Sequence, residues 1–209
     1  MSMDLAEAAE LVALAKTSKD HLVCAPHVTL SRTYQDMWRH IHNGGIGRPP
    51  TARGFYGWAG PDLDPFFYEP GGGPMFDLGV YNITTLTGLL GPAKRVMAMT
   101  GIAIPERIVN NKKMTVQTDD NSQVLMDFGN QCFGVVTTGF TIPRHDVPGI
   151  EVCGTEGTVN MLSDDWDPDG YKLWRNKDGF GQDHSARSRW SWTDGVRDLI
   201  QAVQRGASR

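Results

Sequence analysis

The sequence lacks the features that mark several large classes of protein. Its three cysteines, Cys24, Cys132 and Cys153, lie far apart and form no C-x-x-C pair, which argues against a disulfide framework or a zinc site. The net charge is -4 and the pI is about 5.8, so no basic surface for nucleic acid is expected. No apolar run approaches the roughly 20 residues that span a bilayer. We therefore expect no metal, no nucleic-acid partner and no membrane partner.

The first residues also lack a leader. Met1 to Asp4 carry neither a basic region nor an apolar stretch, so no secretory signal peptide is expected. The cysteines lie in apolar, strand-like runs, and we expect buried free thiols in a reducing cytoplasm. The chain has 209 residues, 40% of them hydrophobic and 21% charged, which is ordinary for a soluble globular protein. That length suits one large domain, or one domain with part of another.

The most informative stretch begins with three consecutive glycines, Gly71 to Gly73, whose backbone can adopt positive φ and allow close approach. Pro74 suits the first turn of a helix. Apolar residues then recur at spacings of three and four as far as Leu90, and Gly91-Pro92 ends the pattern. The sequence therefore predicts a glycine-rich turn followed by a helix from Pro74 to Leu90.

Asp77 and Tyr81 are four residues apart in this helix, so a carboxylate and a phenol share one face near its start. Such a pair can transfer a proton. Alternatively, Asp77 caps free N–H groups at the helix N-terminus, and Tyr81 is a packed aromatic with a satisfied hydroxyl. The residues alone leave both interpretations open.

The run GGGPMFDLGVYN resembles the motif of the Gfo/Idh/MocA family of nicotinamide-dependent sugar and polyol oxidoreductases. That motif has three glycines followed by Asp-x-Gly-x-His or Asp-x-Gly-x-Tyr, and the last position here is Tyr81, as in the glucose–fructose oxidoreductase branch. The resemblance implies that Tyr81 is the acid/base group and that Asp77 orients it or the substrate. It also implies a sugar-like substrate and NAD or NADP as cofactor.

Further site residues follow from the same resemblance. Gly73 and Asn82 of the motif, with Glu69 beside the glycine run, are candidates for contacting the substrate. His27 lies just beyond an expected strand end, where α/β sheets place ligands, and side chains there line the cleft in the family. His27 is thus a candidate for contacting both substrate and cofactor, and Pro26 for contacting the cofactor, although His27 is equally explained as a surface loop residue.

The N-terminal segment is expected to be half of a βαβ unit. Met3 to Thr17 predicts an amphipathic helix, and His21 to Pro26 predicts a short buried strand. In the family, a helix and strand of this kind close the Rossmann-type dinucleotide-binding domain. We therefore divide the chain into a remnant of that domain, 1–28, and a substrate-binding and oligomerisation domain, 29–209.

Two motifs of a complete enzyme are missing. The chain contains neither a G-x-G-x-x-G after a strand nor a Glu-Lys-Pro segment, whose lysine is the family's usual catalytic partner. We therefore expect weak or no NAD(P) binding by this chain alone. Whether it is a gene fragment, an expressed piece or a natural short protein stays open.

The remaining chain predicts an α+β fold with an open, mainly antiparallel sheet and helices on one face. A helix is expected to end at Asn43-Gly44-Gly45, and a polar loop is expected from Lys177 to Arg189. Trp190 to Arg209 predicts a last helix. Strands are expected at hairpin spacing, over Ala52–Trp58, Lys94–Ile104, Met114–Thr118, Ser122–Phe128, Cys132–Thr141, Gly149–Cys153, Thr158–Leu162 and Tyr171–Trp174.

The uncovered face of that sheet is apolar enough to predict a homo-oligomer, a dimer or tetramer in the family. Three functions remain open at this point. The first is a truncated oxidoreductase acting on a sugar, cyclitol or similar polyol. The second is an NAD-dependent glycoside hydrolase of the same family, and the third is a non-catalytic module that associates through its sheet.

Overall fold

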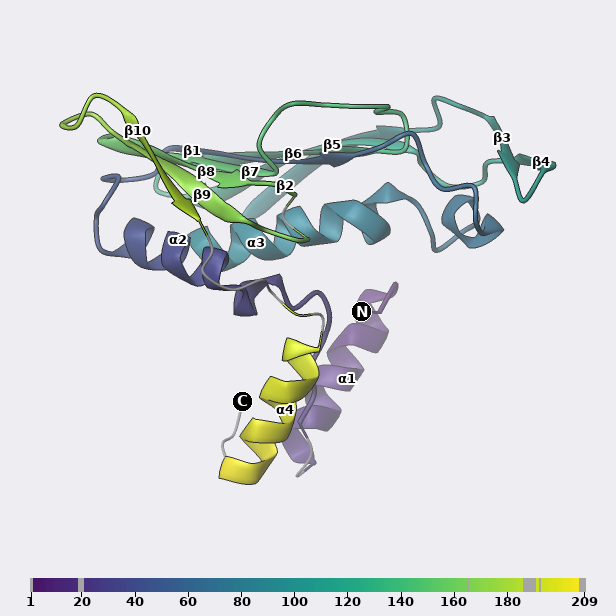
Figure 1. Cartoon of the computed structure of the whole chain (residues 1–209). Helices are drawn as coiled ribbons and strands as arrows, with labels where there is room; N and C mark the ends of the chain where they lie inside the picture. Colours follow the sequence, from purple (N-terminus) through teal and green to yellow (C-terminus); the bar gives the residue numbers. More distant parts are fainter. Residues whose placement is uncertain (1, 19–20, 165, 186–190, 192, 207–209) are drawn as a thin grey trace.

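The computed structural model describes residues 2–18, 21–164, 166–185, 191 and 193–206. Figure 1 shows a broad sheet with two helices, α2 (Arg32–His42) and α3 (Val80–Leu90), lying against one of its faces. Two further helices, α1 (Leu5–Thr17) and α4 (Asp194–Arg205), project away from this layered body on the helix side. We call the sheet with α2 and α3 the body, and α1 with α4 the leg.

The sheet has eight strands in the order β10-β9-β8-β7-β1-β6-β5-β2. Every neighbouring pair is antiparallel except β1 and β6, which run parallel. This confirms the α+β fold with a mainly antiparallel sheet and helices on one face. In sheet order, the strands are β10 (Gly181–Ser185), β9 (Gly170–Arg175), β8 (Gly157–Leu162), β7 (Ile150–Cys153), β1 (Thr51–Gly57), β6 (Cys132–Gly139), β5 (Asn121–Gly129) and β2 (Arg95–Gly101). A separate hairpin pairs β3 (Glu106–Val109) with β4 (Lys112–Thr115).

The core lies between this sheet and its two helices. Side chains alternate along β5, so that Val124, Met126 and Phe128 are buried under the helices, while Leu125 between them is exposed and Asp127 is half-buried. Leu86 and Leu89 of α3 pack into the same cluster. The buried face of the strands and the buried faces of the two helices therefore pack together in one apolar layer, as the sequence pattern predicts.

The helix after the glycine run begins with an unusual turn. Residues Met75–Gly79 form a π-helical turn, which continues directly into α3. Gly91, with φ +89°, ends α3 and its N–H donates to the carbonyl of Thr87. The predicted helix is thus confirmed, but its first turn is wider than an α-helix, a feature that often marks functional sites.

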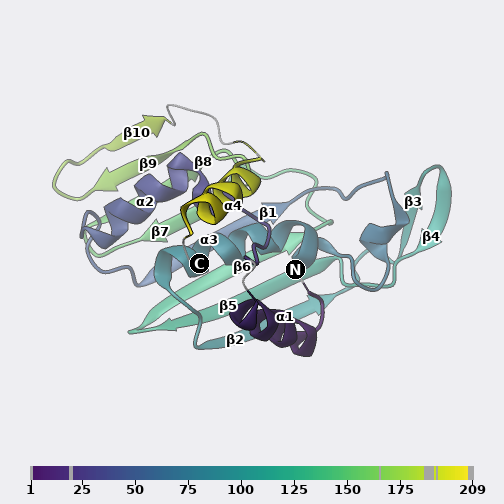
Figure 2. The same ribbon diagram turned by 90° about the horizontal axis from the view of Figure 1, so that it is seen from below.

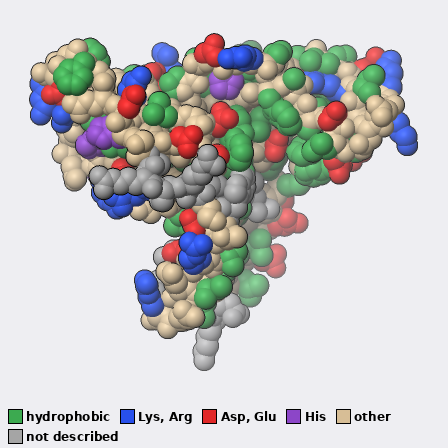
Figure 3. Space-filling model, in the orientation of Figure 1, with side chains coloured by type: hydrophobic (Ala, Val, Ile, Leu, Met, Phe, Trp, Pro, Cys, Tyr) green, Lys and Arg blue, Asp and Glu red, His purple; other side chains and the backbone are tan. Residues whose placement is uncertain are grey.

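The leg contrasts with the body in its burial. Asp4 caps α1 by accepting hydrogen bonds from the N–H groups of Ala6 and Glu7, yet α1 contains no buried residue. Figures 1 and 2 together show α1 and α4 on the same side of the body but separated from one another. Figure 3 shows hydrophobic side chains along the leg, and the large ones that are exposed are Leu5, Leu11, Val12, Leu14, Val196, Ile200 and Val203.

Some sequence expectations were wrong. Residues 21–26 form no strand, because no other strand of the described chain lies beside them to pair with, and Cys24 is exposed. Gly181–Ser185, expected to be loop, forms β10 by pairing with β9, and β3 was missed. Cys132 is buried as expected and Cys153 is half-buried. Trp190 and Trp192, expected at the start of the last helix, lie outside the described residues.

Within the part of the chain that the structure describes, no helix is both long enough and apolar enough to cross a bilayer. The same residues contain no cluster of three or more His, Cys, Asp or Glu side chains arranged to hold a metal ion.

Candidate functional site

The glycine run is required by the shape of the backbone. Gly71 and Gly73 have φ of +100° and +90°, a conformation that favours glycine. A Cβ on Gly72 would collide with the carbonyl oxygen of Phe66. The run thus folds back on the preceding 3₁₀ turn, Pro65–Tyr68, with the Gly73 N–H donating to the Phe67 carbonyl at 2.9 Å. These constraints fix the direction in which the chain continues from the glycine run into the π turn.

The π turn places Asp77 next to the main cavity. Its N–H donates to the Gly73 carbonyl at 3.1 Å, which fixes the residue relative to the glycine run. The side chain is half-buried, and desolvation raises the pKa of the Asp77 carboxyl above its usual range. A carboxyl in such surroundings can both accept a hydrogen bond and exchange a proton closer to neutral pH.

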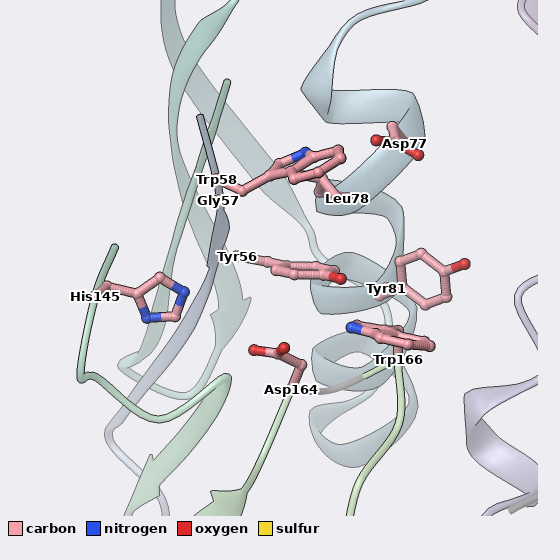
Figure 4. A pocket seen from close by; sticks show the side chains of 9 residues that line it. All are labelled: Tyr56, Gly57, Trp58, Asp77, Leu78, Tyr81, His145, Asp164 and Trp166. Carbon is pink, nitrogen blue, oxygen red and sulfur yellow. The ribbon is translucent and has the colours of Figure 1, made fainter. Parts of the chain in front are cut away.

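The main cavity has a volume of about 460 Å³, within the range of small-molecule sites. Figure 4 shows its walls, which come from β1, the start of α3 and two distant loops. They consist mostly of aromatic rings and carboxylates. The lining residues are Tyr56, Gly57, Trp58, Asp77, Leu78, Tyr81, His145, Asp164 and Trp166.

Tyr81 and Asp77, paired from sequence, are therefore brought to one cavity. The Tyr81 ring meets the Tyr56 ring edge-on, with 6.2 Å between centroids and 68° between planes. In Figure 4 the Tyr81 hydroxyl points away from Tyr56. A phenol and a carboxyl held on one helix at a cavity wall can share the transfer of a proton to or from a bound hydroxyl compound.

A second, smaller cavity of about 300 Å³ adjoins the first, and Asp77 lines both. Its wall includes Met3 from the segment before α1, so the leg begins at the edge of the site. Gly73, expected to contact substrate, lines this second cavity and not the first. The full lining is Met3, Phe66, Phe67, Gly71, Gly72, Gly73, Phe76 and Asp77.

The other sequence candidates lie elsewhere. Asn82 is fully buried against Gly54 of β1, and its amide nitrogen donates to the Gly149 carbonyl at 3.3 Å. Glu69 is exposed and lines neither cavity. His27 packs against Gly195 at the start of α4, and neither it nor Pro26 lines a cavity described here. The structure thus joins Asp77 and Tyr81 in the main cavity and leaves these four residues outside it.

Sequence reasoning missed the far wall of the main cavity. Asp164 and Trp166 follow β8, and His145 lies in the loop between β6 and β7, more than 60 residues from Tyr81 in the chain. No local motif joins them to the helix. The one available signal was the aromatic alternation of β1, which carries Tyr56 and leads to Trp58, because a strand beside a glycine-rich helix start can present rings to a site.

Comparison with known proteins gives the class. The sequence of residues 34–160 matches the GFO/IDH/MocA C-terminal domain, and this match covers more than half of the chain. The chain therefore belongs to the GFO/IDH/MocA family. No curated protein sequence matches it significantly.

Solved structures show the same fold. An NAD-binding oxidoreductase from Klebsiella pneumoniae superposes with a TM-score of 0.80 at 20% identity, over 98% of this chain and 61% of that one. A levoglucosan dehydrogenase in complex with NADH and levoglucosan superposes with a TM-score of 0.78 at 19% sequence identity, over 98% of this chain and 62% of that one. An oxidoreductase from Thermotoga maritima superposes with a TM-score of 0.77 at 18% sequence identity, over 99% of this chain and 59% of that one. This chain thus spans about three fifths of the length of these relatives.

Proposed function

We propose that this chain is the substrate-binding part of an NAD(P)-dependent oxidoreductase that acts on a sugar, cyclitol or similar polyol. The observation that carries the proposal is the placement of Asp77 and Tyr81 at one aromatic-lined cavity, through a π turn, in a chain of this family. The levoglucosan complex of a structural relative supports a sugar-like substrate.

In this proposal Tyr81 accepts the proton of the substrate hydroxyl that is oxidised, or donates a proton to the oxygen of the carbonyl that is reduced. Asp77, whose pKa is raised by burial, accepts a hydrogen bond from the substrate or from Tyr81 and fixes its orientation. The ring of Tyr56 supports the Tyr81 ring from the side. A bound nicotinamide would supply the hydride chemistry.

The described residues do not fit a whole dinucleotide. The only parallel strand pair among them is β1 with β6, and neither strand leads into a glycine-rich helix start of the dinucleotide-binding type. We propose that a separate dinucleotide-binding domain supplies that site and packs on the exposed apolar side chains of the leg. His27 and Pro26, at the junction of leg and body, would face that domain.

The proposal is tested by joining the dinucleotide-binding domain of one solved relative ahead of residue 4 and assaying sugars by NADH absorbance. Tyr81→Phe should lower kcat by about 10² to 10⁴, since the ring survives while the transferable proton is lost. Tyr171→Phe, a buried tyrosine outside the cavity, is the matched control and should leave kcat nearly unchanged. A near-normal kcat for Tyr81→Phe would refute the catalytic role. Sugar release without stoichiometric NADH would favour the hydrolase instead.

We further propose that two copies pack through the open face of the sheet. Three apolar side chains form a row across β2, β5 and β6 there, because Met97 lies opposite Leu125 and Leu125 lies opposite Val135 on the neighbouring strands. The exposed fractions of these three side chains are 70%, 46% and 39%. An exposed apolar row of this kind marks an association surface.

Sedimentation at roughly tens of micromolar, a range that detects weak association, should show a dimer or tetramer. Leu125→Lys should give a monomer, because it places a charge in the middle of the row. Leu63→Lys, an exposed leucine in a loop off the sheet, is the control. A wild-type monomer under these conditions would refute the interface.

A further inference from the structure

Among the described residues that line the main cavity, two carry a carboxylate and none is a lysine or arginine. The two carboxylates belong to Asp77 and Asp164. Within the described residues neither carboxylate forms a salt bridge, whereas Asp36, Asp120 and Asp127 each contact an arginine. An anionic substrate would therefore meet two unbalanced carboxylates in this cavity.

The two carboxylates come from different parts of the fold. Asp77 lies on the α3 side with Tyr81, whereas Asp164 follows β8. Ser163, between β8 and Asp164, has φ +64° and turns the chain there. Figure 4 shows Asp164 between His145 and Trp166, with its carboxylate turned toward the side of His145. The cavity thus has a reactive side and a second polar side.

The second side contains a polar atom that still lacks a partner. The Nδ1 atom of His145 is buried and makes no hydrogen bond within the described part of the chain. Its ring packs at 4.6 Å from Phe55, and the side chain lines the cavity. A buried imidazole nitrogen without a partner is costly, which points to a ligand or water that completes this side.

Aromatic rings enclose the space between these polar groups. Four of the nine lining residues are tyrosine or tryptophan: Tyr56, Trp58, Tyr81 and Trp166. Rings of this kind attract an ammonium group through their negative faces and pack equally well against the C–H groups of a saturated ring. Unbalanced carboxylates together with such rings are the chemistry that selects a protonated amine.

We propose that the substrate is an amino-substituted polyol, an amino sugar or aminocyclitol, whose ammonium group binds Asp164 while its reacting hydroxyl faces Tyr81. The inference rests on the proposed function, because it takes the same cavity as the substrate site. It makes Asp164 the residue that determines specificity, with His145 hydrogen-bonding a neighbouring hydroxyl. We expect a sugar acid or sugar phosphate to bind more weakly, because the two carboxylates repel its negative charge.

The test measures binding to the 209-residue chain, because all nine lining residues belong to it. Glucosamine, glucose, N-acetylglucosamine and gluconate are titrated at neutral pH and followed by NMR chemical shifts of the tryptophan indole N–H groups. Glucosamine should bind at least tenfold more tightly than the two neutral sugars, and gluconate most weakly of all. Salt should reduce the preference, because it screens the charges.

Asp164→Asn should bring glucosamine to the affinity of glucose and leave glucose itself unchanged. Asp62→Asn, an exposed loop carboxylate outside the cavity, should keep the preference. The wild-type series tests the proposal even if Asp164→Asn does not fold.

Equal binding of glucosamine and glucose, tight binding of gluconate, or no binding of glucosamine at tens of millimolar would overturn the proposal. So would a preference that survives Asp164→Asn. None of these results involves hydride transfer. Failure here is thus distinguishable from failure of the proposed function, which would appear as a completed enzyme inactive on every polyol.

Discussion

The body and the leg of this chain bury their apolar residues to very different degrees. In the body, Leu86, Val136 and Ile150 are fully buried between the sheet and its helices. In the leg, α1 buries nothing, and Leu5 and Leu14 are 86% and 61% exposed. α1 is rich in the strong helix formers Ala, Leu and Glu, whereas α3 contains Thr84, Thr85, Thr87 and Gly88, so the difference lies in tertiary packing and not in local propensity.

The comparison separates a region that buries its own core from one that does not. The body contains that core and positions the main cavity with residues from β1, the helix that starts at the π turn and two loops. The leg displays apolar stripes that an isolated helix pair cannot satisfy. In the function proposed above, this division matches two roles, with the substrate bound at the body and the cofactor held through the leg.

Truncating one leucine in each region should give the largest contrast in stability. Leu86→Ala removes a fully buried side chain and should lower the free energy of unfolding by about 2 to 5 kcal/mol. Leu14→Ala should change it by less than about 0.5 kcal/mol, because this side chain is mostly exposed. Urea denaturation followed by circular dichroism measures both. Equal losses would show that α1 is packed as tightly as α3.

The second largest effect should be on cofactor binding, which is expected to need a domain that packs on the leg. NADH titrated into the 209-residue chain should show no saturation at micromolar concentrations, because no described strand leads through a G-x-G-x-x-G turn into a helix that could hold its phosphates. The chain joined to a relative's dinucleotide-binding domain should bind at least tenfold more tightly. Fluorescence of NADH reports both. Saturable micromolar binding by the chain alone would mean that body and leg already form a dinucleotide site.

A smaller effect should be confined to the body. His40 of α2 lies beside His184 of β10 and Tyr171 of β9, with ring centroids 5.7 and 5.8 Å away. Burial lowers the pKa of His40, with smaller contributions in the same direction from His184 and Arg175 and an opposing one from Asp36. The unfolded chain therefore binds this proton more readily than the folded chain does.

It follows that His40 contributes its full stability above a pH of about 6.5 and that this contribution is lost as the pH falls below that value. His40→Gln should flatten the change in unfolding free energy between pH 7.5 and 5.5, measured by urea denaturation. His42→Gln, on the exposed side of the same helix, should leave that change as it is. An unchanged slope in His40→Gln would assign the pH dependence to other groups.

Much of the body was predictable because its determinants are local. The alternation of Val124, Met126 and Phe128 predicts β5 and its buried face. The glycine run and the apolar spacing after it predict the helix, and the spacing of Asp77 and Tyr81 predicts that they share one face, which the structure places at the main cavity. Local periodicity and turn chemistry suffice for such elements.

The remaining features depend on partners distant in the chain. β10 forms because β9 lies beside it, and its polar sequence carries no strand signal of its own. Asp164, Trp166 and His145 reach the cavity only through the order of the strands in the sheet. Conversely, His21 to Pro26 has the composition of a buried strand but no neighbour with which to pair. Asn82 lies in the recognised motif, yet its amide serves the packing of α3 on β1.

Amide hydrogen exchange of the 209-residue chain tests the division between body and leg most directly. Amides of β5, β6 and α3 should exchange only at the rate of global unfolding, whereas those of α1 and α4 should exchange with almost no protection. Joining the dinucleotide-binding domain should then protect α1 and α4 and leave the body unchanged. Full protection of α1 and α4 in the chain alone, or none after the domain is joined, would contradict the account.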